Sequence, residues 1–112
     1  MDAHREEIAA TILMQLTDNR CGTGTAAAKR LSVAVGARDF LILESGVSFR
    51  IMRNAARITH VSIKLAPEDT YRVEFGRLRK LDYTVLEVAE GVHCDQLRQV
   101  FETATSLYLI AI

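Results

Sequence analysis

Several residue types and spacings on which common protein classes depend are missing from the sequence. It has no tryptophan and only two cysteines, Cys21 and Cys94, which lie far apart and form no CxxC pair. That pattern argues against a disulfide framework and against a four-ligand zinc site. The three histidines, His4, His60 and His93, share no metal-ligand spacing. We therefore expect no metal ion and no other cofactor.

Long hydrophobic runs are also missing, because no apolar stretch reaches the roughly 18 residues that span a bilayer. Residues 1–7 are polar and acidic, and no signal-peptide pattern precedes the first apolar stretch. With 112 residues, of which 49% are apolar and 25% charged, the chain fits one globular core. These features predict a single soluble domain over residues 1–112, kept in the cytoplasm and without membrane contact.

Catalytic motifs are absent as well, and we do not expect an enzyme. The two glycines within residues 21–25 follow a helix pattern, whereas a phosphate-binding loop follows a strand. A flexible connection is therefore predicted there. His93, Cys94 and Asp95 are neighbours in sequence, but adjacent side chains at a helix start point in different directions. Nucleophilic chemistry by Cys94 with His93 or His60 is kept as a minor alternative.

Two amphipathic helices are predicted from apolar residues at spacings of three and four. The first covers residues 3–16, and the second runs from residue 94 or 95 to 107. Their apolar stripes comprise Ile8, Ile12 and Leu16 in the first, and Leu97, Val100, Phe101, Ala104 and Leu107 in the second. The tail over residues 108–112 is too apolar to stay in water, so we expect it to pack against the core.

Alternation of apolar and polar residues predicts an antiparallel sheet of about five strands between these helices. The strand-like runs are residues 31–35, 39–44, 47–51, 58–65, 71–75 and 83–88. The last run has the mixed polarity of a sheet edge. Residues 26–30 fit either a helical turn or the start of a strand, and residues 76–80 predict a basic turn. The expected fold class is α+β, with an N-terminal and a C-terminal helix on one face of the sheet.

The net charge is zero, but the charges are segregated along the chain. Residues 29–80 carry +6, whereas residues 1–28 carry −2 and residues 81–112 carry −4. If the helices cover one sheet face, the opposite face and the rims display most of the central cations. The candidate binding residues are Arg50, Arg53, Arg57, Lys64, Arg72, Arg77, Arg79 and Lys80. They suit phosphate or an acidic protein surface; the alternative is a solvated face whose charge Glu44 and Glu74 partly offset.

Sequence-specific recognition of nucleic acid is not expected from these residues. Tyr71 and Phe75 alternate onto the core side, so no exposed platform for base stacking is predicted. The C-terminal helix carries Arg98 against Asp95 and Glu102, which is too little positive charge for binding in a major groove. The basic residues therefore suit contact with a phosphate backbone or with a protein.

Several stretches that span most of the chain carry a resemblance to a known group of proteins. They are residues 11–16, 36–40, 47–50, 58–61, 69–75 and 95–98, together with Val100 and Phe101. In these stretches the chain resembles small uncharacterised proteins encoded by phages, prophages and mobile elements. It departs from their pattern in an alanine-rich insert near residues 22–30 and in Ser106, where glycine is more typical. The resemblance implies a phage or mobile-element context and supplies no catalytic residues.

The leading hypothesis is a small accessory protein that binds a host protein or nucleoprotein complex in the host cytoplasm. By analogy of context, it would act as an inhibitor of a host machine, for example of a CRISPR–Cas complex. The alternative is a nucleic-acid-binding protein without sequence preference. Whether the edge strand near Tyr83 pairs with a second copy to form a homodimer is left open.

Overall fold

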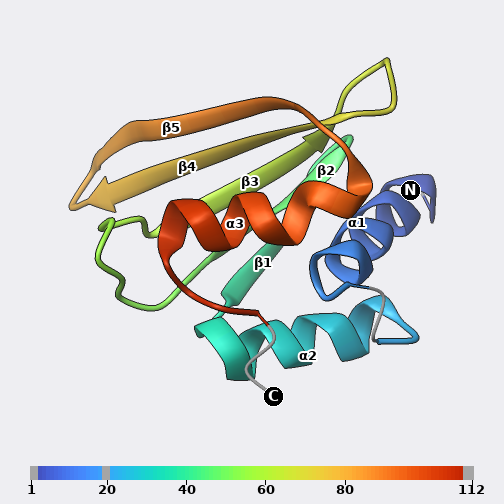
Figure 1. Ribbon diagram of the computed structural model, residues 1–112, viewed down its shortest axis with the longest axis horizontal. Helices are drawn as coiled ribbons and strands as arrows, with labels where there is room; N and C mark the ends of the chain where they lie inside the picture. The colour runs from blue at the N-terminus through green and yellow to red at the C-terminus, as the bar shows by residue number, and fades with distance from the viewer. Residues whose placement is uncertain (1–2, 19–20, 110–112) are drawn as a thin grey trace.

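The computed structural model describes residues 3–18 and 21–109, which form an α+β fold (Figure 1). The helices are α1 (Ala3–Leu16), α2 (Gly24–Val35) and α3 (Leu97–Thr105), and a short 3-10 turn, η1 (Cys94–Gln96), precedes α3. The strands are β1 (Arg38–Ile42), β2 (Gly46–Arg50), β3 (His60–Leu65), β4 (Tyr71–Arg79) and β5 (Asp82–Val92). They form one antiparallel meander in the order β1-β2-β3-β4-β5. The predicted α+β class and the antiparallel sheet of five strands are confirmed, and the structure has one more helix than the two predicted.

The core lies between the sheet and the helices, because alternate strand residues are buried. Phe49, Val61 and Phe75 stand side by side across β2, β3 and β4, and each is at most 1% exposed. Ile12 and Leu16 of α1 and Leu97 and Phe101 of α3 belong to the same buried cluster. Burying each such side chain contributes about 1.5–3 kcal/mol, which makes this layer the main source of stability.

The helix predicted over residues 3–16 has those bounds in the structure. The C-terminal helix ends at Thr105, two residues earlier than predicted, because Ser106 adopts a left-handed φ of 62°. The Ser106 N–H then donates to the Glu102 carbonyl at 2.8 Å. Leu109 is buried as expected, but Tyr108 is 65% exposed, so the prediction for that residue is wrong. Residues 110–112 lie outside the described residues.

The strand predicted at residues 31–35 is wrong, since this segment is the second half of α2. The Thr23 hydroxyl caps the helix by accepting from the Ala26 N–H at 3.1 Å, so the predicted flexible connection is in fact a helix start. Ala27, Leu31 and Val35 are fully buried at a spacing of four. The segment alternates like a strand, but this buried stripe and the preceding alanines select the helix.

The basic turn predicted at residues 76–80 is also wrong, because β4 continues to Arg79 and the turn is confined to Lys80 and Leu81. Gly76 lies inside this strand, and the Tyr83 ring fills the space where a side chain at position 76 would lie. A Cβ added to Gly76 would overlap the ring. The Tyr83 hydroxyl donates to Glu74 Oε2 at 3.0 Å and holds the ring there.

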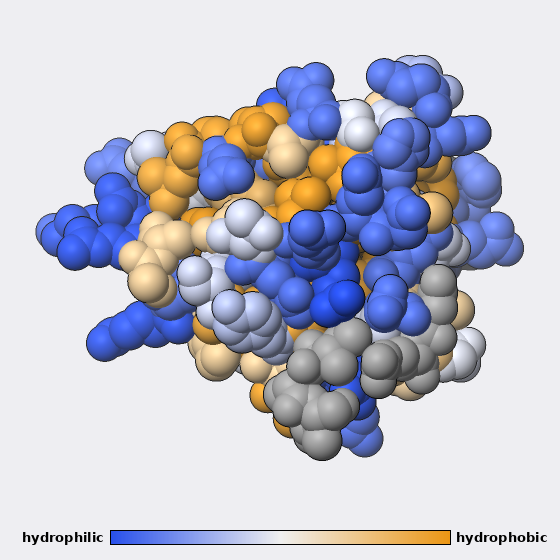
Figure 2. Space-filling model, viewed as in Figure 1, coloured by the Kyte–Doolittle hydropathy of each residue, from blue (hydrophilic) through white to orange (hydrophobic). Residues whose placement is uncertain are grey.

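β5 is an edge strand, as predicted, although it is longer than the predicted run over residues 83–88. Its register with β4 shifts twice, between Tyr71 and Val73 and between Phe75 and Gly76. It carries Asp82, Glu87 and Glu90 and no basic residue. Apolar side chains along β5 are partly exposed and form orange surface near the top of Figure 2.

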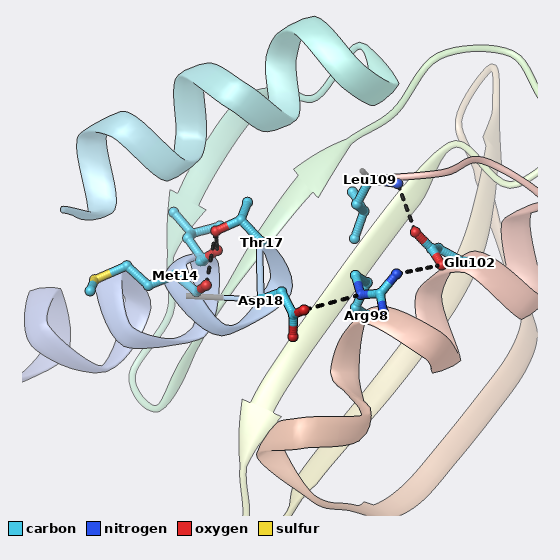
Figure 3. A network of polar contacts seen from close by, with 7 residues as sticks. Met14, Thr17, Asp18, Arg98, Glu102 and Leu109 are labelled. Atoms are coloured by element: carbon cyan, nitrogen blue, oxygen red, sulfur yellow. Dashed lines mark hydrogen bonds and ion pairs between the residues drawn. The ribbon is translucent and has the colours of Figure 1, made fainter. Parts of the chain in front are cut away.

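Polar contacts fasten α3 to the end of α1 and to the segment that follows α3 (Figure 3). The Arg98 guanidinium lies 4.0 Å from Asp18 Oδ2 and 3.3 Å from Glu102 Oε1. The other Glu102 oxygen accepts from the N–H of the buried Leu109 at 2.9 Å. Arg98 is the single arginine or lysine in the acidic segment 81–112. Its contacts show that it helps to hold α3 in place. Within the described residues, no helix has the length and hydropathy that a membrane span requires.

Candidate functional site

Arginine side chains gather around a hollow at the end of the sheet where β2 ends, β3 begins and β4 ends. The hollow has a volume of about 750 Å³. Six arginines line it: Arg38, Arg50, Arg53, Arg57, Arg77 and Arg79. None of the described lining residues is acidic. We call this feature the arginine hollow.

One wall of the arginine hollow is the connection between β2 and β3, and Asn54 organises it. The Asn54 amide nitrogen donates to the carbonyls of Met52 and Ile58, at 2.9 and 2.7 Å. Its amide oxygen accepts from the Ile58 N–H at 3.1 Å. This side chain therefore closes a compact loop with Arg53 and Arg57 on its exposed surface.

The opposite wall is the far part of β4, which presents Arg77 and Arg79. The same connection is bonded to this strand, since the Thr59 N–H donates to the Gly76 carbonyl at 2.9 Å. The Thr59 hydroxyl also accepts from the Leu78 N–H at 2.8 Å. The two walls of the arginine hollow are thus held together by hydrogen bonds, so the guanidinium groups are brought together before any ligand arrives.

Few of these cations are neutralised inside the molecule. Asp39 Oδ2 lies 4.0 Å from Arg38 Nε and 3.9 Å from an Arg50 nitrogen, in pairs that are largely exposed and therefore weak. For the other four arginines, no ion pair within 4 Å is formed with the described part of the chain. Arg50 Nε is buried and has no hydrogen-bond partner there either. An anion in the hollow would supply partners for the exposed guanidinium groups.

The positive charge of the site acts on the neighbouring histidine. His60 pairs with Arg50 across β2 and β3. Partial burial lowers the pKa of His60, and the Arg50 charge lowers it further, against a smaller opposing effect of Asp39. The imidazole is therefore neutral at pH 7, and its Nδ1 lies 2.7 Å from the Thr59 hydroxyl. The histidine helps to position Thr59 and adds no charge to the hollow at that pH.

A second hollow of about 390 Å³ adjoins the first at the β4–β5 turn. We call it the hairpin hollow; its lining is Arg77, Arg79, Lys80, Asp82 and Thr84. Arg77 and Arg79 line both hollows, so the two lie next to each other. At the left of Figure 2, strongly hydrophilic side chains project where Figure 1 places this turn.

Six of the eight predicted binding residues are brought together in this region, and two are not. Lys64 faces Arg72 across β3 and β4, away from both hollows. Arg72 is also engaged by carboxylates, at 3.1 Å from Glu74 and 3.8 Å from Glu90. The basic sheet face expected from the sequence is therefore divided, and six of the eight residues lie at one end of the sheet.

Arg38 was missed by the sequence reasoning. It reaches the arginine hollow because β1 shifts register between Arg38 and Leu41, which places Arg38 opposite Arg50. Asp39, inside this bulge, has a positive φ of 56°. Strand alternation does not reveal a bulge, so only the count of basic residues in the segment pointed toward Arg38.

The other polar residues considered from the sequence do not converge. Cys21 is half-buried and Cys94 exposed, and both are free thiols. Gln96, the last residue of η1, accepts from the His93 N–H at 3.1 Å in a capping contact. Across residues 3–18 and 21–109, no three His, Cys, Asp or Glu side chains are grouped to hold a metal ion.

Comparisons with known proteins give no assignment for this site. No family model, curated protein or solved structure matches the chain.

Proposed function

We propose that the chain is a binding protein that engages a nucleoprotein complex of the host, with the arginine hollow receiving phosphate groups of the nucleic acid. The observation that carries this proposal is the set of four arginines, Arg53, Arg57, Arg77 and Arg79, which lack carboxylate partners in the described structure although they line one hollow. Guanidinium groups bind phosphate oxygens through two parallel N–H bonds, which suits such a cluster.

The regularity of its charge favours a nucleic-acid strand over an acidic protein surface. A nucleic-acid strand carries one negative charge at every nucleotide, whatever its sequence. A polypeptide carries one only where Asp or Glu occurs, and alternate side chains of an extended segment point to opposite faces. Six arginines around one hollow suit the polyanion whose charge recurs at every unit. Binding to an acidic protein remains a distinguishable outcome of the test below.

The resemblance to small phage and mobile-element proteins gives this proposal its biological setting. Packing of all three helices on one face of the sheet would leave the end with the arginine hollow free to contact a large partner (Figure 1). A protein that occupies the phosphates of a host complex would block that complex in the host cytoplasm. A CRISPR–Cas complex is one candidate target by analogy of context.

The test compares two double variants with equal change in charge. Arg53→Glu with Arg57→Glu reverses two exposed residues of the arginine hollow, and Lys29→Glu with Lys64→Glu reverses two exposed residues outside it. We expect the first pair to abolish capture of the complex from host lysate and the second to leave capture intact. Unchanged capture by the first pair contradicts the proposal. Capture that survives nuclease treatment of the lysate would instead indicate an acidic protein partner.

The second candidate is direct binding of naked nucleic acid without sequence preference. It is favoured because the described lining of the arginine hollow carries six arginines and no acidic residue, which suits contact with the phosphate backbone. Affinity should then fall steeply between low and moderate salt, because each neutralised phosphate releases counterions. Absence of binding to single strands and duplexes at low salt excludes this candidate.

A further inference from the structure

We infer that the ligand of the arginine hollow is a single nucleic-acid strand, whose backbone runs on into the adjoining hairpin hollow. This inference rests on the proposed function and names the form of nucleic acid that the site takes. It depends on the adjacency of the two hollows, on their size, and on the chemistry of their walls.

The two hollows lie next to each other along β4, because both are lined by Arg77 and Arg79, and we call them together the track. These residues are two apart on β4, so they project from the same face of the strand about 7 Å from each other. That separation is comparable with the distance between successive phosphates in an extended strand. Lys80 continues the cations past Arg79 into the turn. A linear polyanion can therefore contact cations of both hollows in succession, whereas an isolated phosphate uses only one.

The size of the track favours a single strand over a duplex. The arginine hollow measures about 750 Å³ and the hairpin hollow about 390 Å³, comparable with pockets for small molecules and short polymer segments. The two strands of a duplex are held apart by grooves of about 6 and 12 Å. Its paired strands cannot both enter these hollows, so a duplex would touch the arginines only from outside. A flexible single strand can place successive phosphates inside the hollows, between their walls.

The walls also predict how the strand lies. Besides the arginines, the arginine hollow is lined by small or apolar residues such as Met52, Ala55 and Leu78, and its described lining has no aromatic ring. Bases therefore gain no stacking platform inside the track, and the backbone is the part that is held. We expect little dependence of affinity on base identity.

The decisive experiment measures binding of fluorescent oligo(dT) strands of about 4 and about 12 nucleotides at low salt. Arg57→Glu, at the arginine hollow, should weaken both strands about tenfold or more. Lys80→Glu, at the far end of the track, should weaken only the longer strand, by several-fold, and reduce its salt slope by about 0.7 per lost contact. Lys64→Glu, an equal charge change on the sheet away from the track, should alter neither.

The outcomes separate this inference from the function on which it rests. Tighter binding of the long strand than of an equally long blunt duplex, together with a length-dependent effect of Lys80→Glu, supports the track. Equal or tighter binding of the duplex, or equal effects of Lys80→Glu on both lengths, overturns it. If capture of the host complex depends on Arg53 and Arg57 but no naked single strand binds at low salt, the inference fails and the proposed function stands.

Discussion

At the scale of single residues, Asn54 shows how an uncharged side chain can control a charged site. It makes three hydrogen bonds within the connection that carries Arg53 and Arg57, and it touches no charged group in doing so. Ordering a loop costs roughly 1–2 kcal/mol per residue in backbone entropy. A loop that is already ordered does not pay this cost again when a ligand binds.

We therefore expect Asn54→Ala to weaken oligonucleotide binding although all six arginines are retained. Loss of the hydrogen bonds should cost about 1–3 kcal/mol in stability, and the freed loop should lower affinity about three- to tenfold. Calorimetry should show a more unfavourable binding entropy, which a loss of direct contact would not produce. Asn54→Asp keeps the acceptor for the Ile58 N–H but sets an oxygen against the Met52 and Ile58 carbonyls, so it should lose at least as much stability as Asn54→Ala. Unchanged affinity in Asn54→Ala would mean that the loop is held by its backbone alone.

Tyr83 links the stability of the β4–β5 hairpin to pH. Partial burial is the main reason that its pKa is raised to about 12, and the hydrogen bond to Glu74 and the charge of Glu74 raise it further. The folded protein thus favours the neutral phenol, so the stabilisation is complete below pH 10. It is lost as the pH rises from 10 through about 12, because the unfolded chain releases the proton first.

Tyr83→Phe should cost about 1 kcal/mol at neutral pH through loss of the hydrogen bond to Glu74. The difference in unfolding free energy between the wild type and this variant should shrink above pH 10 and approach zero near pH 12. Denaturant titrations at a series of pH values measure it. Tyr108→Phe serves as the control, because Tyr108 is exposed and its hydroxyl makes no hydrogen bond within residues 3–18 and 21–109. A constant difference for Tyr83→Phe across this range would refute the coupling.

At the scale of elements, α3 depends on Glu102 as well as on its apolar stripe. The Glu102 side chain is only 14% exposed and joins Arg98 of α3 to the N–H of the buried Leu109. Glu102→Ala would leave both partners without their acceptor, at a cost of about 2 kcal/mol. We expect a lower urea midpoint with an unchanged slope. Glu102→Gln, which keeps an acceptor for Leu109, should lose about half as much, and the exposed Glu87→Ala should change little.

The sequence predicted those elements whose hydrophobic period is unambiguous. The helix over residues 3–16 and the alternating strands through Val61 and Tyr71 came out as expected, because one face of each is buried and the other is not. The strand prediction for residues 31–35 was wrong because their apolar positions fit both a period of two and a stripe at every fourth residue. The stronger indications were local: the Thr23 cap before the helix and Gly36, with its φ of 65°, after it.

The candidate site was predictable in composition but not in arrangement. The excess of basic residues in the middle of the chain is visible in the sequence, and six of the eight chosen residues line the two hollows. The exclusion of Lys64 and Arg72 follows from strand register and from ion pairs with Glu74 and Glu90. The inclusion of Arg38 follows from a bulge. Neither pairing partners nor bulges are encoded in local periodicity.

At the scale of the whole molecule, the zero net charge conceals a polarised surface. The arginine hollow and the hairpin hollow concentrate cations at one end of the sheet, whereas β5 carries only acidic charges. A ligand approaching from solution meets a field that depends on direction, which raises the rate of productive encounters at low salt. This orienting effect fades when the Debye length falls below about 10 Å.

The irregular outer strand has a final consequence for how molecules of this protein coexist. Its two shifts in register bend the backbone out of line, and its carboxylates repel a like-charged neighbour. Pairing of another chain with β5 is thereby disfavoured, although apolar side chains are exposed along this strand. Extension of the sheet by a second copy would therefore have to take place at β1, the opposite edge.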